Sequence, residues 1–172
     1  MESGIKMSKS NEINLLNRIQ AAFETRNRPV VFTDSSELTA TELADLETVI
    51  QLEWNEVTCT DWENYFDVIS WFSPEAFCYY LAGIYKASIV EKQPNLIVIT
   101  NIIGMLDRSP NIEWWDDFFL KRWPLLTQKE CEATQEWILW LASFESLSVD
   151  LDSLERALQT IDLLITQKNK DS

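Results

Sequence analysis

The chain has 172 residues, 46% of them hydrophobic, with 28 acidic and 14 basic side chains and a net charge of −14 at pH 7. This length and apolar content suffice for one sizeable core without disulfide or metal support, so we expect a single domain. The dispersed bases disfavour direct nucleic-acid binding, which needs clustered lysine and arginine. Histidine is absent, which removes the commonest general base and the commonest metal ligand.

The first residues, 1–10, are polar and lack the apolar region of a secretory signal, so we expect a disordered segment and a cytoplasmic protein. No apolar run approaches the length of a membrane span. The three cysteines, Cys59, Cys78 and Cys131, are odd in number and widely spaced. They are expected to be reduced thiols, with no disulfide framework and no zinc site.

The scarcity of glycine, three residues in 172, leaves few positions for hairpin turns. We therefore expect an all-α fold, a bundle of about six to seven helices over residues 11–170. A first helix is predicted over residues 11–25, with Ile13, Leu16, Ile19 and Phe23 on one apolar stripe. Residues 30–32 have no partner strand and are expected to cross the core as an extended segment.

Acidic side chains dominate the next part of the chain. Residues 29–85 contain no lysine or arginine but eleven carboxylates, while the other 17 acids are nearly balanced by all 14 bases. A like-charged block attracts cationic partners and speeds encounter by roughly 10- to 10³-fold at low salt. We expect a basic partner, although acidity that only keeps the protein soluble is the alternative explanation.

Two helices are predicted within this acidic stretch. Thr39 and Glu42 have the spacing of a capping box, and the helix that they open is expected to reach about residue 54, with Leu43 facing inward. The next helix is expected to begin near Asp61 as its N-cap, with Trp62 on its apolar face.

Ser73-Pro74-Glu75 is the clearest helix start: an N-cap hydroxyl, a proline at the first position and an acid in the first turn. The helix that follows is expected to be the central one. Residues 96–106 are rich in β-branched side chains but have no partner strand, so we expect a helix there as well.

An aromatic stripe occupies residues 112–123: Trp114, Trp115, Phe118, Phe119 and Trp123. Their spacing indicates a short amphipathic helix, or a pair of turns, that fills the core. A second capping box at Thr127 and Glu130 predicts a helix over residues 127–144, and a last helix is expected over residues 150–168.

The motif Ser73-Pro74-Glu75-Ala76-Phe77-Cys78-Tyr79-Tyr80-Leu81 resembles the centre of an uncharacterised bacterial family of small acidic helical proteins, typically Ser/Thr-Pro-Glu-Ala-Phe-Arg-Tyr-Tyr-Leu-Pro. Cys78 and Ala82 stand in the positions of the family's arginine and proline. The resemblance implies a helical fold and a bacterial cytosol, and it carries no chemistry. Small acidic proteins of this kind are often the inhibitors of toxin–immunity pairs, which is an analogy.

Paired carboxylates are the remaining candidates for catalysis or for binding a metal ion: Asp116 with Asp117, Glu53 with Glu56, and Asp61 with Glu63. None has calcium-loop spacing or nearby glycines, so we interpret them as solvated surface. Cys78 has no base to activate it. We expect no enzymatic activity, no cofactor and no metal.

The sequence therefore favours an acidic binding protein that neutralises a basic protein partner, expected to be a bacterial toxin, with a nuclease as one candidate. The expected partner-binding residues are Glu53, Glu56, Asp61, Trp62, Glu63, Tyr65 and Asp67. Trp62 or Tyr65 would anchor the contact if it is not wholly buried. The alternatives are a nucleic-acid mimic that regulates a DNA- or RNA-binding protein, a homodimeric interaction protein, and an enzyme built on Asp116 and Asp117. The sequence does not distinguish a monomer from a homodimer.

Overall fold

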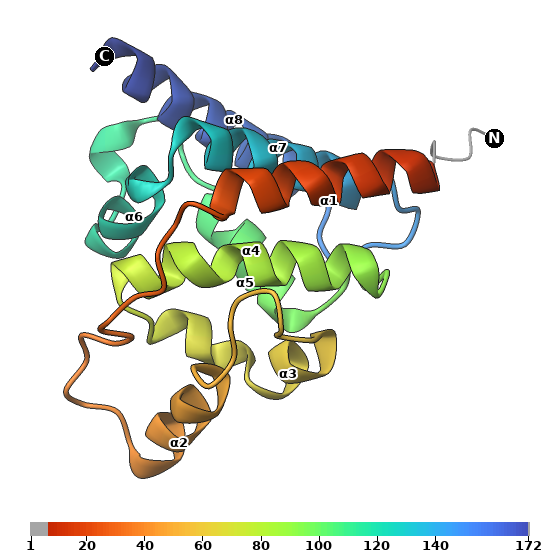
Figure 1. Ribbon diagram of the computed structural model, residues 1–172. Coiled ribbons are helices and arrows are strands. Elements are labelled where there is room, and N and C mark those ends of the chain that lie inside the picture. Colours follow the sequence, from red (N-terminus) through yellow and green to blue (C-terminus); the bar gives the residue numbers. More distant parts are fainter. Residues whose placement is uncertain (1–6, 172) are drawn as a thin grey trace.

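Helices make up all the regular secondary structure of residues 7–171, the part of the chain that the computed structural model describes (Figure 1). They are α1 (Lys9–Phe23), α2 (Ala40–Val49), α3 (Cys59–Asn64), η1 (Phe66–Ser70), α4 (Pro74–Val90), α5 (Ile97–Leu106), η2 (Ile112–Trp114), α6 (Asp117–Arg122), η3 (Trp123–Leu125), α7 (Gln128–Ala142) and α8 (Leu151–Lys170). The all-α prediction is confirmed. The expected number of helices is too low, because these residues form eight α-helices and three short 3₁₀ helices (η). Within them, no helix has both the length and the apolar character that crossing a membrane requires.

The central element is α4, whose side chains are almost all buried. On one side of it lie α1, α7 and α8, and on the other lie α2, α3 and η1 (Figure 1). α5 joins the two sides through contacts with α8, α3 and η1. The predicted start of α4 is confirmed: the Ser73 hydroxyl accepts a hydrogen bond from the Ala76 N–H, and Pro74 occupies the first turn, where its missing N–H costs nothing.

Capping boxes open α2 and α7 as predicted, through Thr39 with Glu42 and Thr127 with Glu130. α2 nevertheless ends at Val49, well before the expected residue 54. Beyond it the chain turns and runs onto α4, where the Leu52 carbonyl accepts a hydrogen bond from the Tyr80 hydroxyl and Trp54 is buried.

The predicted N-cap of α3 is wrong. Thr58 is the N-cap, and Asp61 is the third helical residue, which completes a capping box by accepting the Thr58 N–H at 2.9 Å. The Thr58 hydroxyl accepts the Asp61 N–H at 3.2 Å, and the Cys59 N–H donates to Glu91 at 2.8 Å, so a local capping box and a tertiary bond both favour the earlier start.

α1 begins two residues earlier than predicted, at Lys9, because the Ser8 hydroxyl accepts the Asn11 N–H and caps the helix. The predicted disordered segment 1–10 falls mainly on residues 1–6, which lie outside the described residues. Residues 30–32 form no strand: the carbonyls of Val31 and Phe32 accept hydrogen bonds from Ser73, so this segment crosses the start of α4.

Aromatic side chains dominate the core, in which Trp123, Trp137 and Tyr85 are fully buried. The prediction of a core-filling stripe over residues 112–123 holds for Trp115, Phe119 and Trp123, but not for Trp114, which is 73% exposed. Leu43, expected to face inward, is exposed, and Leu46 and Val49 supply the buried side of α2.

Candidate functional site

The acidic loop between α2 and α3, residues 50–58, is fastened to α4 by two tyrosines. The Tyr79 hydroxyl donates to the Glu53 carboxylate at 2.8 Å, and the Tyr80 hydroxyl donates to the Leu52 carbonyl at 2.8 Å. Burial, followed by the bond to Glu53, raises the pKa of Tyr79, so its proton stays on the hydroxyl at neutral pH. The loop is therefore held in one position.

Close backbone packing fixes the same loop further along α4. A β-carbon built on Gly83 would lie 2.5 Å from the carbonyl oxygen of Trp54, closer than any side chain permits. One turn later, the Lys86 ammonium donates to the Asn55 carbonyl at 3.0 Å. Gly83 thus gives the loop the space to lie directly on the helix.

Three of the predicted interface carboxylates already have roles inside the chain. Glu53 accepts from Tyr79 and lies 3.6 Å from an Arg28 nitrogen. Glu56 accepts the Glu53 N–H at 2.7 Å, and Asp61 caps α3. These carboxylates shape the loop, and a partner would have to compete with these bonds.

The expectation that Trp62 could contact a partner is wrong, because its side chain has no exposed surface. It lies on the face of α3 that packs against α4, with its ring centroid 6.3 Å from that of Tyr80. A tryptophan on the apolar face of a helix gains more from burial than from exposure.

The remaining predicted residues are accessible. Glu63 and Asp67 are exposed and have no hydrogen-bond or ion-pair partner among the described residues. Tyr65 is half-buried at the C-terminal end of α3, between them in sequence. The structure therefore narrows the predicted interface to Glu63, Tyr65 and Asp67, which we call the α3–η1 face.

Among the described residues, no ion pair within 4 Å joins the C-terminal half to the acidic stretch. Of the eleven carboxylates in residues 29–85, only Glu53 has an ion-pair partner among residues 7–171. Arg108 and Arg156 pair with the carboxylates of Asp116 and Asp107, outside the acidic stretch. The negative charge of this region therefore remains open to solvent.

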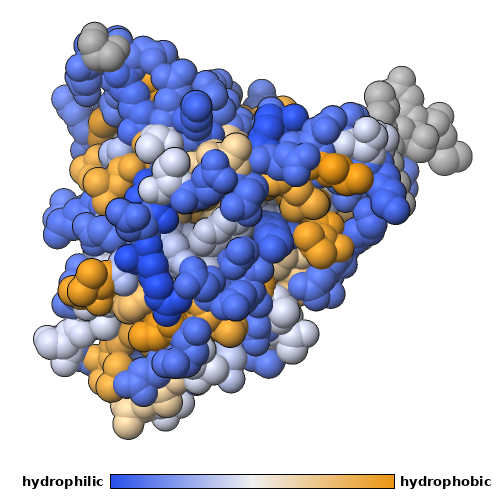
Figure 2. Space-filling view, in the orientation of Figure 1, coloured by the Kyte–Doolittle hydropathy of each residue, from blue (hydrophilic) through white to orange (hydrophobic). Residues whose placement is uncertain are grey.

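Exposed apolar side chains accompany the acids. Val30 is 95% exposed, and Val31 and Leu43 are 60% and 42% exposed. Figure 2 shows hydrophobic atoms at the lower end of the molecule, over α2 and the segment before it. An apolar area beside free carboxylates offers a partner both hydrophobic and ionic contact.

The candidate nucleophile Cys78 is buried, and the candidate acid Asp116 has a structural role. Burial is the main cause that raises the pKa of Cys59, Cys78 and Cys131 to about 12, so all three thiols stay protonated at neutral pH. Asp116 caps α6 by accepting the Phe119 N–H, and this bond lowers its pKa more than the neighbouring Arg108 does. Asp117 is exposed and has no hydrogen-bond or ion-pair partner for its carboxylate among the described residues.

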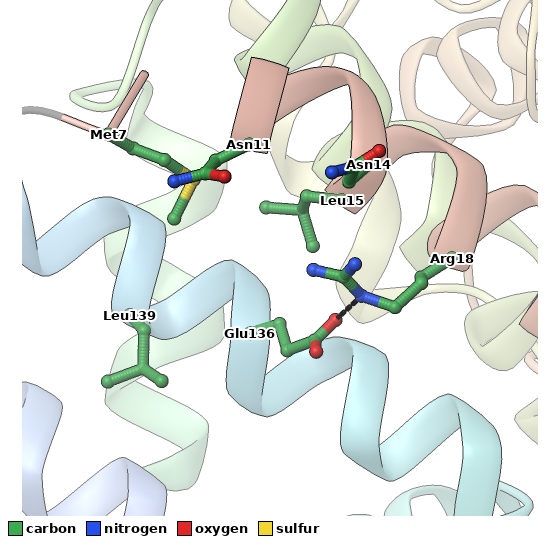
Figure 3. Close-up of a pocket in the computed structure, with 7 residues that line it drawn as sticks. All are labelled: Met7, Asn11, Asn14, Leu15, Arg18, Glu136 and Leu139. Atoms are coloured by element: carbon green, nitrogen blue, oxygen red, sulfur yellow. Dashed lines mark hydrogen bonds and ion pairs between the residues drawn. The ribbon is translucent and has the colours of Figure 1, made fainter. Parts of the chain in front are cut away.

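A groove of about 280 Å³ separates the first half of α1 from α7 (Figure 3). Leu15 points into it, while Met7 and Leu139 lie at one end. At the other end Arg18 and Glu136 form an ion pair of 2.5 Å across the groove. Among the described residues, Glu136 is the one carboxylate that lines this groove, and it is already paired.

Sequence reasoning missed the side chains that hold the acidic loop, namely Tyr79, Tyr80 and Lys86. Gly83 did give a signal, because glycine in a helix interior costs stability and indicates a close neighbour. No protein-family model, curated protein or solved structure matches the chain. The resemblance over residues 73–81 therefore remains a prediction.

Proposed function

We propose that this protein is a cytoplasmic inhibitor that binds a basic bacterial protein, a toxin, and covers its cationic surface with the α3–η1 face. The observation that carries the proposal is the uncompensated charge of residues 29–85, where Glu63 and Asp67 are exposed and unpaired among the described residues. Binding, without catalysis, is the activity that we assign to this face.

The mechanism has two parts. The regional negative charge accelerates encounter with a cationic surface, and this acceleration weakens as salt screens it. Glu63 and Asp67 then pair with lysine or arginine side chains of the toxin, while Tyr65 supplies apolar contact.

The fastened loop supports tight binding. Tyr79, Tyr80 and Gly83 hold the neighbouring backbone of residues 50–58 before any partner arrives. A surface that is already ordered loses less conformational entropy on association, so more of the contact energy remains as affinity.

The test is affinity capture from lysate of the cells that carry this gene, with the wild-type protein and two charge-reversed variants as bait. Glu63→Lys with Asp67→Lys changes the α3–η1 face. Glu132→Lys with Glu155→Lys is the matched control, since it changes net charge equally at exposed positions on α7 and α8.

We expect a basic protein to be retained by the wild type and the control, and lost from the first variant and at high salt. The captured protein, once purified, should lose its toxic activity when wild-type protein is added. Equal retention by both variants would disprove the role of the α3–η1 face.

A further inference from the structure

Trp114 is an aromatic side chain that the fold leaves in water. It is 73% exposed, whereas the seven other tryptophans are buried or half-buried. Its neighbour Trp115 is buried, and the indole N–H of Trp115 donates to the Ser109 carbonyl at 2.9 Å. Tryptophan is among the residues most enriched at the energetic centres of protein interfaces. An indole with this much exposed surface is therefore a candidate contact point.

The turn that carries Trp114 is fixed on both sides. Before it, the Asn111 side chain accepts the Glu113 N–H at 3.2 Å, and the Asn111 carbonyl accepts the Trp114 N–H at 3.1 Å. After it, Asp116 pairs with Arg108 at 2.8 Å. The indole is therefore presented by an ordered backbone, and a ligand would not have to order the turn.

Two unpaired carboxylates flank the indole along the chain. Glu113 precedes Trp114 within η2, and Asp117 begins α6; both are exposed and have no partner among the described residues. Lys121, one turn after Asp117, forms no ion pair with it within 4 Å. An exposed aromatic side chain with a free carboxylate within three residues on each side along the chain suits a cation that also has a flat surface.

We infer that the Trp114 turn, residues 112–117, binds an arginine side chain of a basic protein. The guanidinium would lie over the indole while Glu113 and Asp117 balance its charge. Arginine fits better than lysine, because its planar and weakly hydrated group stacks on aromatic rings. The chain itself contains this geometry at three places, including Arg122 over Phe118 at 3.8 Å and Arg108 over Phe119 at 4.4 Å.

This inference rests on the proposed function in one respect, the basic nature of the partner. Figure 1 shows α6 well away from α2 and α3, so the Trp114 turn would be a second contact point in addition to the α3–η1 face. A toxin that engages both would have arginines in two separate patches, and this spacing would distinguish it from other cationic proteins.

The test uses the full chain labelled with 5-fluorotryptophan and observed by ¹⁹F NMR at low salt. Hexa-arginine is the probe and hexalysine the comparison, and Trp114→Phe assigns the Trp114 resonance. Hexa-arginine should shift this resonance and leave the resonances of buried Trp62 and Trp137 unmoved. The dissociation constant for this turn should be about two- to fivefold lower for hexa-arginine than for hexalysine.

Glu113→Gln with Asp117→Asn should weaken the hexa-arginine titration of Trp114 at least twofold, whereas Glu132→Gln with Glu155→Gln should leave it unchanged. ¹⁵N spectra recorded on the same samples report on the α3–η1 face. Shifts at Glu63 and Asp67 without a shift at Trp114 would overturn this inference and leave the proposed function standing. Equal responses to both peptides, with no effect of removing the two carboxylates, would also overturn it.

Discussion

The carbonyl oxygen of Trp54 lies 2.5 Å from the position that a β-carbon on Gly83 would occupy. This close approach lets the acidic loop lie directly on α4, where Tyr79, Tyr80 and Lys86 also hold it, because any larger residue would force the two backbones apart. Loop position and helix packing are thus one feature, and the two can be tested together.

Gly83→Ala should destabilise the protein by about 1–3 kcal/mol, the typical cost of an added atom in a packed region. Gly104→Ala is the matched control, since Gly104 lies in α5, is exposed and has no atom within 4 Å of a built β-carbon. It should stabilise by about 0.4–1 kcal/mol. Urea unfolding of both variants measures the difference, and equal effects would contradict the close approach.

Arg26→Met should cost about 3–5 kcal/mol, because it leaves the Glu130 carboxylate, 1% exposed, without its bidentate partner. Arg18→Met removes an exposed pair with Glu136 and should cost less than about 1 kcal/mol. Thermal unfolding of the two variants side by side checks the contrast. A small effect of the first would show that Glu130 finds another partner or becomes protonated.

Asp61→Ala should destabilise by about 0.5–2 kcal/mol, because it removes the carboxylate that completes the capping box of α3. Asp67→Ala should leave stability unchanged or raise it slightly, since Asp67 has no described partner and only repels neighbouring acids. Urea unfolding at low salt measures the free energy of unfolding of both variants and shows the difference. Similar losses for both would mean that Asp67 has a structural role.

Stability should fall as pH rises above about 9. In the folded state, burial raises the pKa of Cys78 from 9.0 to about 12. Between these two pH values the unfolded chain loses the thiol proton while the folded chain keeps it, which lowers the free energy of the unfolded state and therefore the stability of the fold. Cys78→Ala should therefore flatten the slope of unfolding free energy against pH by about 1.4 kcal/mol per pH unit in this window. Urea titrations at pH 8 to 11 measure the slope, and an unchanged slope would show that the thiol ionises in the fold.

Much of the secondary structure could be predicted because caps are local signals. Ser73 with Pro74, and the boxes at Thr39 and Thr127, each set a helix start through bonds within four residues. The end of α2 could not be predicted, because it depends on tyrosines from α4, some 25 residues later in the chain.

The candidate site was predicted less completely than the fold. Composition identified the acidic stretch, but the division between structural and free carboxylates depends on which partners the fold supplies. Asp61 and Asp67 look alike in sequence, and only the position of Thr58 separates them. The stripe position of Trp114 likewise predicts a buried side chain, yet the 3₁₀ turn that carries it leaves it exposed.

The burial of Cys59, Cys78 and Cys131 has a practical consequence for labelling. Maleimide dyes need an accessible thiolate, and the folded chain offers none of its own. A single cysteine introduced at the exposed position 132 or 155, outside the proposed contact residues, would therefore accept a fluorophore selectively, so that distances to a bound partner could be measured with the binding faces unchanged.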